Sequence, residues 1–166
     1  MKTKDITVMA FFLSITIVLE KVLEVLPNVQ LTAFLILLFT TLYSFKRSLL
    51  FIFLYVVLDI LISGYFNPLF ALSMYFGWIW IPVIYNFILH RKNNIFILAI
   101  FMLLFGFIYG WTYIPANIIT NGINVLWPYI LADLPYDIIM GLSSALSTLI
   151  LFIPLYKTLN GMEIDA

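Results

Sequence analysis

Seven of the eight positively charged residues of this chain occur in only some of the gaps between its long apolar runs, and this alternation constrains the fold most. The seven are Lys2, Lys4, Lys46, Arg47, Arg91, Lys92 and Lys157, whereas the gaps around Pro27, Gly64 and residues 121–127 carry no cation. In membrane proteins, loops rich in Lys and Arg stay in the cytoplasm. The sequence therefore predicts six membrane crossings, with both termini in the cytoplasm.

The composition agrees with this prediction. The chain is 64% hydrophobic and 10% charged, and its mean hydropathy is +1.14, which a water-soluble fold of 166 residues could not bury. We expect one all-α integral membrane domain over residues 1–166, a polytopic protein of the plasma membrane. The formal net charge of zero argues against nucleic acid as a partner, and the lack of Cys excludes disulfides and thiolate metal sites.

A helix needs roughly 20 residues to cross a bilayer core of about 30 Å. The predicted segments are 6–26, 31–43, 49–62, 69–89, 95–114 or a little beyond, and 128–156. The second and third are short, so we expect them to tilt little, to thin the bilayer or to extend into their loops. A re-entrant hairpin is the alternative for this pair, but Lys46 and Arg47 at its turn argue against placing that turn in hydrocarbon.

Acidic residues in the outer half of the predicted membrane are the second informative feature. Asp133 and Asp137 are four residues apart and share a helix face. An Asp at the centre of a membrane helix costs about 2.5–3.5 kcal/mol, so Asp137 should face protein, water or ligand. Two interpretations stay open for Asp137: a functional or gating role, and an internal hydrogen bond to a neighbouring polar side chain.

The other acids in this half are Glu20, Glu24 and Asp59. Lys21 is placed to pair with Glu24 three residues later, and such an interfacial pair at a helix end requires no function. The Asp59 side chain could extend to the outer surface or cap the end of its helix there.

Residues with small side chains recur at intervals that allow close helix packing. Ala10 and Ser14 form such a pair in the first segment, as do Gly106 and Gly110 in the fifth. Most such faces pack internally. The Ala10 and Ser14 pair lies near the cytoplasmic end, where a membrane or cytoplasmic partner could reach it.

Motifs for common enzyme chemistry are missing from the sequence. It contains no GxxxxGK[ST], HExxH or GxSxG motif, and its one histidine, His90, stands beside Arg91 and Lys92 in a predicted cytoplasmic gap. We therefore expect no enzyme, no cofactor and no metal site. The chain alone could not use ATP through a P-loop.

Three local patterns resemble a transporter family: Pro27, Asn28, Val29 and Gln30 before the second segment, Gly106 and Gly110 in the fifth, and Leu134, Pro135, Tyr136 and Asp137 in the sixth. In these patterns, and in its length and hydropathy, the chain resembles the substrate-specific S components of energy-coupling factor (ECF) transporters. The resemblance implies a six-helix bundle that binds a vitamin or related micronutrient. It also implies, as partners, a transmembrane scaffold subunit and two cytoplasmic ATPase subunits, which would explain the missing P-loop.

The resemblance also implies site residues. The family's small-residue contact motif, commonly Ala-xxx-Ala, falls on Ala10 and Ser14, where Ser14 departs from the pattern, and the outer gate falls on residues 27–31. The implied ligand site comprises Asn28, Gln30, Asn67, Tyr75, Trp80, Tyr113, Asn117, Asn121, Asn124, Trp127, Asp133 and Asp137.

Amides, aromatic faces and carboxylates favour a planar ring that carries hydrogen-bond donors or partial positive charge. A pyridine, pyrimidine or pterin type fits this description, and a cobalamin-like ligand is a further option. The sequence leaves two other functions open. One is a self-sufficient, proton-coupled secondary carrier in which Asp137 titrates, and the other is a membrane enzyme or assembly factor.

Overall fold

The computed structural model describes residues 3–92 and 94–164, and every regular element in this part of the chain is helical. In chain order the elements are α1 (Thr3–Leu23), α2 (Thr32–Leu42), α3 (Phe45–Ser63), α4 (Pro68–Val83), the π-helical turn η1 (Ile84–Ile88), α5 (Ile95–Trp111), α6 (Ile114–Asn121), the 3₁₀ turn η2 (Ile123–Val125) and α7 (Leu126–Ile164).

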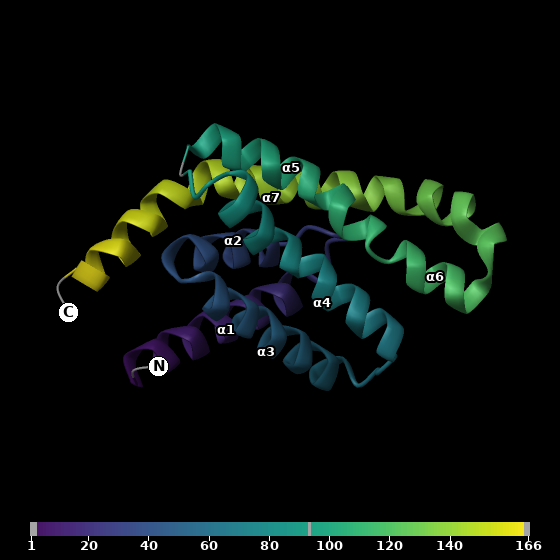
Figure 1. Cartoon of the computed structure of the whole chain (residues 1–166), viewed down its shortest axis with the longest axis horizontal. Helices are drawn as coiled ribbons and strands as arrows, with labels where there is room; N and C mark the ends of the chain where they lie inside the picture. The colour runs from purple at the N-terminus through teal and green to yellow at the C-terminus, as the bar shows by residue number, and fades with distance from the viewer. Residues whose placement is uncertain (1–2, 93, 165–166) are drawn as a thin grey trace.

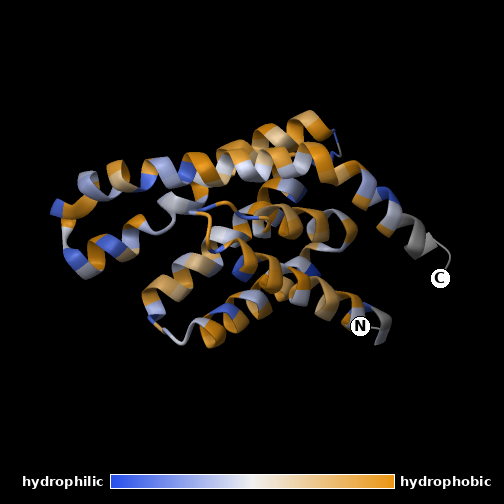
Figure 2. Cartoon of the chain, turned by 180° about the vertical axis from the view of Figure 1, so that it is seen from behind, coloured by the Kyte–Doolittle hydropathy of each residue, from blue (hydrophilic) through white to orange (hydrophobic). Residues whose placement is uncertain are grey.

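Four stretches of these helices are long and apolar enough to cross a membrane. They are Asp5–Leu23, Pro68–Ile88, Ile95–Asn121 and Ile123–Leu159. Many large apolar side chains are exposed on the outside of the bundle, among them Phe11, Leu61 and Ile150, and Figure 2 shows hydrophobic residues along most of the helices. Because water would not tolerate so much apolar surface, these are the features of a helical membrane protein.

Each of the six predicted segments lies mostly on a helix, but the first and the fifth run past the helix ends, since α1 ends at Leu23 and α5 at Trp111. α3 begins at Phe45, four residues before the predicted third segment, so this helix does extend into its loop. α2 remains short, with 11 residues. The stretch that follows the fifth predicted segment forms a separate short helix, α6. Neither Pro135 nor Pro154 ends α7, which is continuous over 39 residues.

α2 lies at the centre of the bundle (Figure 1). Ten of its residues, from Thr32 to Thr41, are buried. Its aromatic side chain Phe39 stacks on Phe51 of α3, with ring centroids 4.4 Å apart, and meets Phe12 of α1 edge-on at 5.4 Å. The core therefore forms around a short helix, nearly all of whose residues are buried.

α5 and α7 lie side by side along much of their length (Figure 1). Glycines permit this approach: a Cβ on Gly106 would lie 2.2 Å from the backbone oxygen of Asp137, and one on Gly141 would lie 2.3 Å from that of Leu103. The predicted small-residue face on the fifth segment is confirmed as an internal packing face. We call this contact the α5–α7 seam.

The described ends of the chain lie toward the same end of the bundle, as do the α2–α3 and α4–α5 connections (Figure 1). The α1–α2, α3–α4 and α6–α7 connections lie away from that end (Figures 1 and 2). The gaps with cations and the gaps without them are thus separated in space.

Candidate functional site

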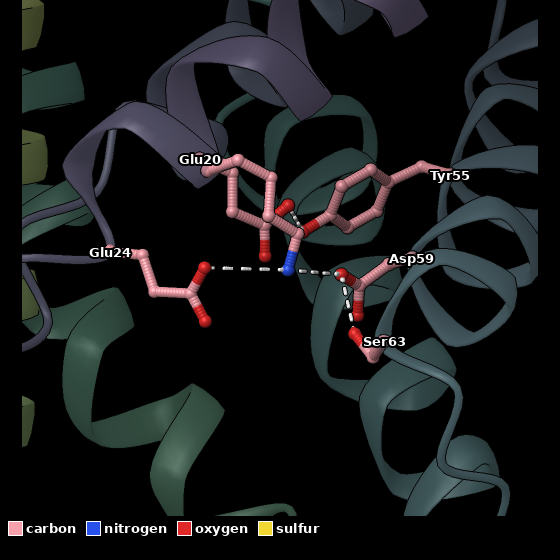
Figure 3. Close-up of polar contacts among 6 residues, drawn as sticks. Glu20, Glu24, Tyr55, Asp59 and Ser63 are labelled. Atoms are coloured by element: carbon pink, nitrogen blue, oxygen red, sulfur yellow. Dashed lines mark hydrogen bonds and ion pairs between the residues drawn. The ribbon is translucent and has the colours of Figure 1, made fainter.

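Polar side chains of α1 and α3 meet near the ends of these helices, as Figure 3 shows for Glu20, Glu24, Tyr55, Asp59 and Ser63. Tyr55 is fully buried, and its hydroxyl donates a hydrogen bond to Oε2 of Glu20 at 2.8 Å. The Ser63 hydroxyl lies 3.4 Å from Oδ1 of Asp59. We call these five residues and Lys21 the α1–α3 cluster.

Lys21 joins the two helices of the cluster. Its Nζ lies 3.6 Å from Oδ1 of Asp59 and 3.8 Å from Oε2 of Glu24. The pairing of Lys21 with Glu24 is confirmed. Asp59 points to α1 rather than only toward the outer surface, and its side chain is 15% exposed.

Helix periodicity explains why these residue types can gather. Glu20 lies on α1 and Glu24 follows it four residues later, in the turn directly after that helix, while Tyr55, Asp59 and Ser63 follow each other by single turns on α3. Each set therefore forms a polar stripe, and the crossing of the two helices brings the stripes together. Among the described residues, no group of His, Asp and Glu could hold a metal ion.

Two small pockets of about 190 Å³ each border this cluster. The first, which we call the loop pocket, is lined by Glu20, Lys21, Leu23, Glu24, Leu26, Asn28, Val29 and Gln30. The second, the α3–α4 pocket, is lined by Asp59, Ile60, Ser63, Tyr65, Asn67, Phe70, Ala71, Met74 and Tyr113. Four of the sequence-predicted residues, Asn28, Gln30, Asn67 and Tyr113, are thus placed at these pockets.

The loop between α1 and α2 is tied to α7. Nδ2 of Asn28 donates to the backbone oxygen of Tyr136 at 2.9 Å, and the backbone N–H of Gln30 donates to Oγ of Ser143 at 3.3 Å. Asn28 has φ of 57°, a left-handed conformation that Asn adopts more readily than most residues. The loop pocket therefore has one wall whose position depends on a few exposed or half-buried hydrogen bonds.

Two of the aromatic side chains that line the α3–α4 pocket are Phe70 of α4 and Tyr113, which directly precedes α6, and Tyr113 adjoins further aromatic residues of α4 and α5. The hydroxyls of Tyr109 and Tyr113 lie 2.9 Å apart, and the ring of Tyr109 contacts that of Trp78 at a centroid distance of 4.4 Å. Phe70 and Tyr113 line the pocket with ring centroids 6.2 Å apart. The pocket thus offers aromatic surface next to the Asp59 carboxylate.

Asp133 and Asp137 lie in the α5–α7 seam and line neither polar pocket. Asp137 is 3% exposed, and a Cβ on Gly110 would lie 2.1 Å from its Oδ1. The hydroxyl of Tyr129 is 2.9 Å from Oδ2 of Asp133 and 3.2 Å from the backbone oxygen of Gly110. Both acids therefore face protein, as the cost of exposing them to lipid requires.

Other predicted site residues lie apart from the cluster. Trp80 is 44% exposed and lines an apolar groove beside α6, and Tyr75 packs edge-on against Phe53. Asn121, Asn124 and Trp127 are exposed around the α6–α7 connection. Asn117 donates its side-chain amide to the backbone oxygen of Tyr113. The structure does not bring these residues together into one site.

The sequence-based set omitted Glu20, Lys21, Glu24, Asp59 and Tyr55, which form most of the cluster. The signal available was the one-turn spacing of Tyr55 and Asp59 on an apolar helix, opposite the same spacing of Glu20 and Glu24. The contact between the two stripes depends on helix packing, which this spacing does not specify.

Comparison of this chain with models of known families, with curated proteins and with solved structures found no match. The fold and the site define a helical membrane protein with a polar, partly hollow region at one end of an apolar bundle.

Proposed function

We propose that this chain is the substrate-specific subunit, or S component, of an ECF-type importer in the plasma membrane. In this proposal it crosses the membrane six times and both termini are cytoplasmic. The grouping of the chain ends with the cation-bearing connections at one end of the bundle supports this orientation. A scaffold subunit and two ATPases would supply the energy that the chain has no P-loop to harness.

One observation carries the proposal: a polar site with two pockets lies between apolar helices, at the end opposite the cation-bearing connections. A partly buried ion pair and hydrogen-bonded carboxylates in a membrane bundle cost free energy to desolvate, and polar groups at such places are commonly functional. In the proposed orientation this site faces outward, where a water-soluble vitamin or related micronutrient could be captured. Aromatic and polar groups side by side suit a small heteroaromatic ligand.

Ala10 and Ser14 form the proposed contact with the scaffold subunit. Both are exposed on α1, and the Ser14 hydroxyl donates to the backbone oxygen of Ala10 at 2.9 Å. The hydroxyl is therefore already satisfied, and the pair presents a shallow surface that another helix could approach closely.

The direct test is native mass spectrometry of the protein purified gently from cells grown in rich medium. A vitamin-like mass bound at one per chain would support the proposal and identify the ligand. If the protein is empty, a panel of vitamins should raise its melting temperature. Failure of both experiments would contradict the proposed function.

A proton-coupled secondary carrier is a second candidate, and buried Asp137 is the observation that favours it. The two functions differ in what they require for uptake. A carrier would accumulate substrate in proteoliposomes that contain this chain alone and a proton gradient, whereas the S component would need its partner subunits and ATP.

A further inference from the structure

The Lys21 ammonium lies at the boundary between the two polar pockets. Lys21 and Glu24 line the loop pocket, and Asp59 lines the α3–α4 pocket. The ion pair between Lys21 and Asp59 therefore joins a residue of one pocket to a residue of the other. Its 3.6 Å separation is longer than the 2.7–2.9 Å of a strong charge-assisted hydrogen bond. Asp59 can therefore exchange the Lys21 ammonium for another cationic partner.

The cluster carries more negative than positive groups. The carboxyl groups of Glu20, Glu24 and Asp59 surround the single ammonium of Lys21. Glu20 is engaged by the Tyr55 hydroxyl, so the Lys21 ammonium is shared between Glu24 and Asp59. Low-dielectric walls around such a group of acids concentrate its field and attract cations.

An independent observation also points to a missing partner at this place. The indole of Trp78 is buried, its ring meets that of Tyr55 edge-on at 5.9 Å, and its N–H has no hydrogen-bond partner among the described residues. Leaving a buried polar group unpaired costs about 1–3 kcal/mol. The inner side of the cluster thus has hydrogen-bonding capacity that the described residues do not use.

We propose that Lys21 holds the place of a protonated amine on the ligand, which enters between Glu24 and Asp59 and joins the two pockets into one site. The ring of such a ligand would lie against Phe70 and Tyr113 in the α3–α4 pocket. This inference rests on the proposed function, because it specifies the ligand class of the same site: an aromatic ring that carries a cationic amine.

Lys21 has room to move aside. Its side chain is 33% exposed and that of Glu24 is 70% exposed, so the ammonium can turn toward solvent while it stays near Glu24. The ligand amine would then take over the contact with Asp59. Asp59 thus keeps a cationic partner through this exchange, and the added positive charge offsets part of the excess negative charge of the cluster.

Matched probes test the inference on the full chain in nanodiscs. Benzylammonium and benzyl alcohol share a ring and differ in charge, and calorimetry against empty nanodiscs corrects for lipid partitioning. We expect benzylammonium to bind wild-type protein more tightly than benzyl alcohol. Lys21→Met should tighten benzylammonium binding about tenfold, because the competing ammonium is gone, and a tenfold change corresponds to about 1.4 kcal/mol.

Lys21→Arg is the matched control, since it keeps a cation at the same place and should show no such gain. Asp59→Asn is an independent variant that should weaken benzylammonium binding about tenfold without affecting benzyl alcohol, which is again about 1.4 kcal/mol. Equal binding of the two probes to wild-type protein would overturn the inference. So would tighter binding to Lys21→Met that is equally large for benzyl alcohol.

The two proposals fail in different ways. A co-purified micronutrient without an amine would contradict the inference and leave the S-component function intact. Charge-selective binding together with substrate accumulation by the chain alone would contradict the proposed function and leave the cation site intact.

Discussion

The α1–α3 cluster and the α5–α7 seam both hold acidic side chains inside an apolar bundle, but they enclose them differently. In the cluster, Lys21 and Asp59 are 3.6 Å apart and open pockets lie on both sides. In the seam, Asp137 touches Gly110 so closely that no side chain could replace the glycine without a shift. The comparison indicates that α5 and α7 form a fixed frame, while polar contacts that can be exchanged lie between α1 and α3.

The seam should show the largest loss of stability. Gly106→Ala places a methyl 2.2 Å from the backbone oxygen of Asp137, and backbone cannot move aside as a flexible side chain can. We expect the free energy of unfolding to fall by about 3 kcal/mol, as for overpacking of a tight core. SDS titration in mixed micelles, followed by Trp fluorescence, measures this loss.

Gly64→Ala is the control for this variant. It adds the same methyl where nothing lies within 4 Å, but its φ of +68° strains an alanine, so we expect a loss of only about 1 kcal/mol. Equal losses for Gly64→Ala and Gly106→Ala would show that the seam is not tightly packed.

Tyr55→Phe should give the next largest effect. It removes the donor that holds the Glu20 carboxylate at 2.8 Å, and a half-buried carboxylate is left without that partner. We expect a loss of about 2 kcal/mol in the same titration. Tyr75→Phe is the comparison on α4, and we expect it to be nearly neutral. If Tyr55→Phe is neutral as well, the cluster does not contribute to the stability of the fold.

Ligand affinity distinguishes the α1–α3 cluster from the α5–α7 seam more directly than stability does. Asp59→Asn should weaken binding of the co-purified ligand about tenfold, or about 1.4 kcal/mol, because Asp59 lines a pocket. Asp137→Asn should leave affinity unchanged, because the seam gives a ligand no access to it. Isothermal titration of both variants decides between them. A larger effect of Asp137→Asn would return that residue to the ligand site that the family resemblance implies.

The smallest effect on stability is expected at the proposed coupling face. The double variant Ala10→Leu, Ser14→Leu changes exposed positions on α1, so the free energy of unfolding should change by less than about 0.5 kcal/mol. Ligand binding should persist, but uptake by the complete transporter should stop.

Val18→Leu is the matched control for the coupling face, since Val18 is 58% exposed on the same helix. It should preserve uptake. Normal uptake by the Ala10, Ser14 double variant would exclude this face as the contact with the scaffold subunit.

Local patterns predicted the helices well, because apolar run length and charged gaps determine where membrane helices begin and end. The second segment, 31–43, differs from α2 (Thr32–Leu42) by a single residue at each end. Glycine spacing likewise predicted a packing face on α5, since the backbone oxygen of Asp137 leaves no room for a Cβ at Gly106. The Lys21–Glu24 pair was also predictable from a local pattern, because the two residues are only three positions apart.

The site was predictable only in part. Four amide and aromatic residues do line the polar pockets, but Asn121, Asn124 and Trp127 are exposed near the α6–α7 connection. Residue type alone could not separate an amide that lines a pocket from one that caps a helix; Asn67 does both. The contact of Lys21 with Asp59 joins residues 38 positions apart on different helices, and only the packing of α1 against α3 creates it.

The central helix α2 has a consequence for how the protein is made. Its 11 residues span about 16 Å, roughly half of a bilayer core, and ten of them are buried inside the bundle. Alone in hydrocarbon, its ends would leave backbone groups without partners. We therefore expect α2 to insert into the bilayer during synthesis only after the longer helices that enclose it are available. Nascent chains that end before α4 should be recognised by quality-control proteases as unfinished.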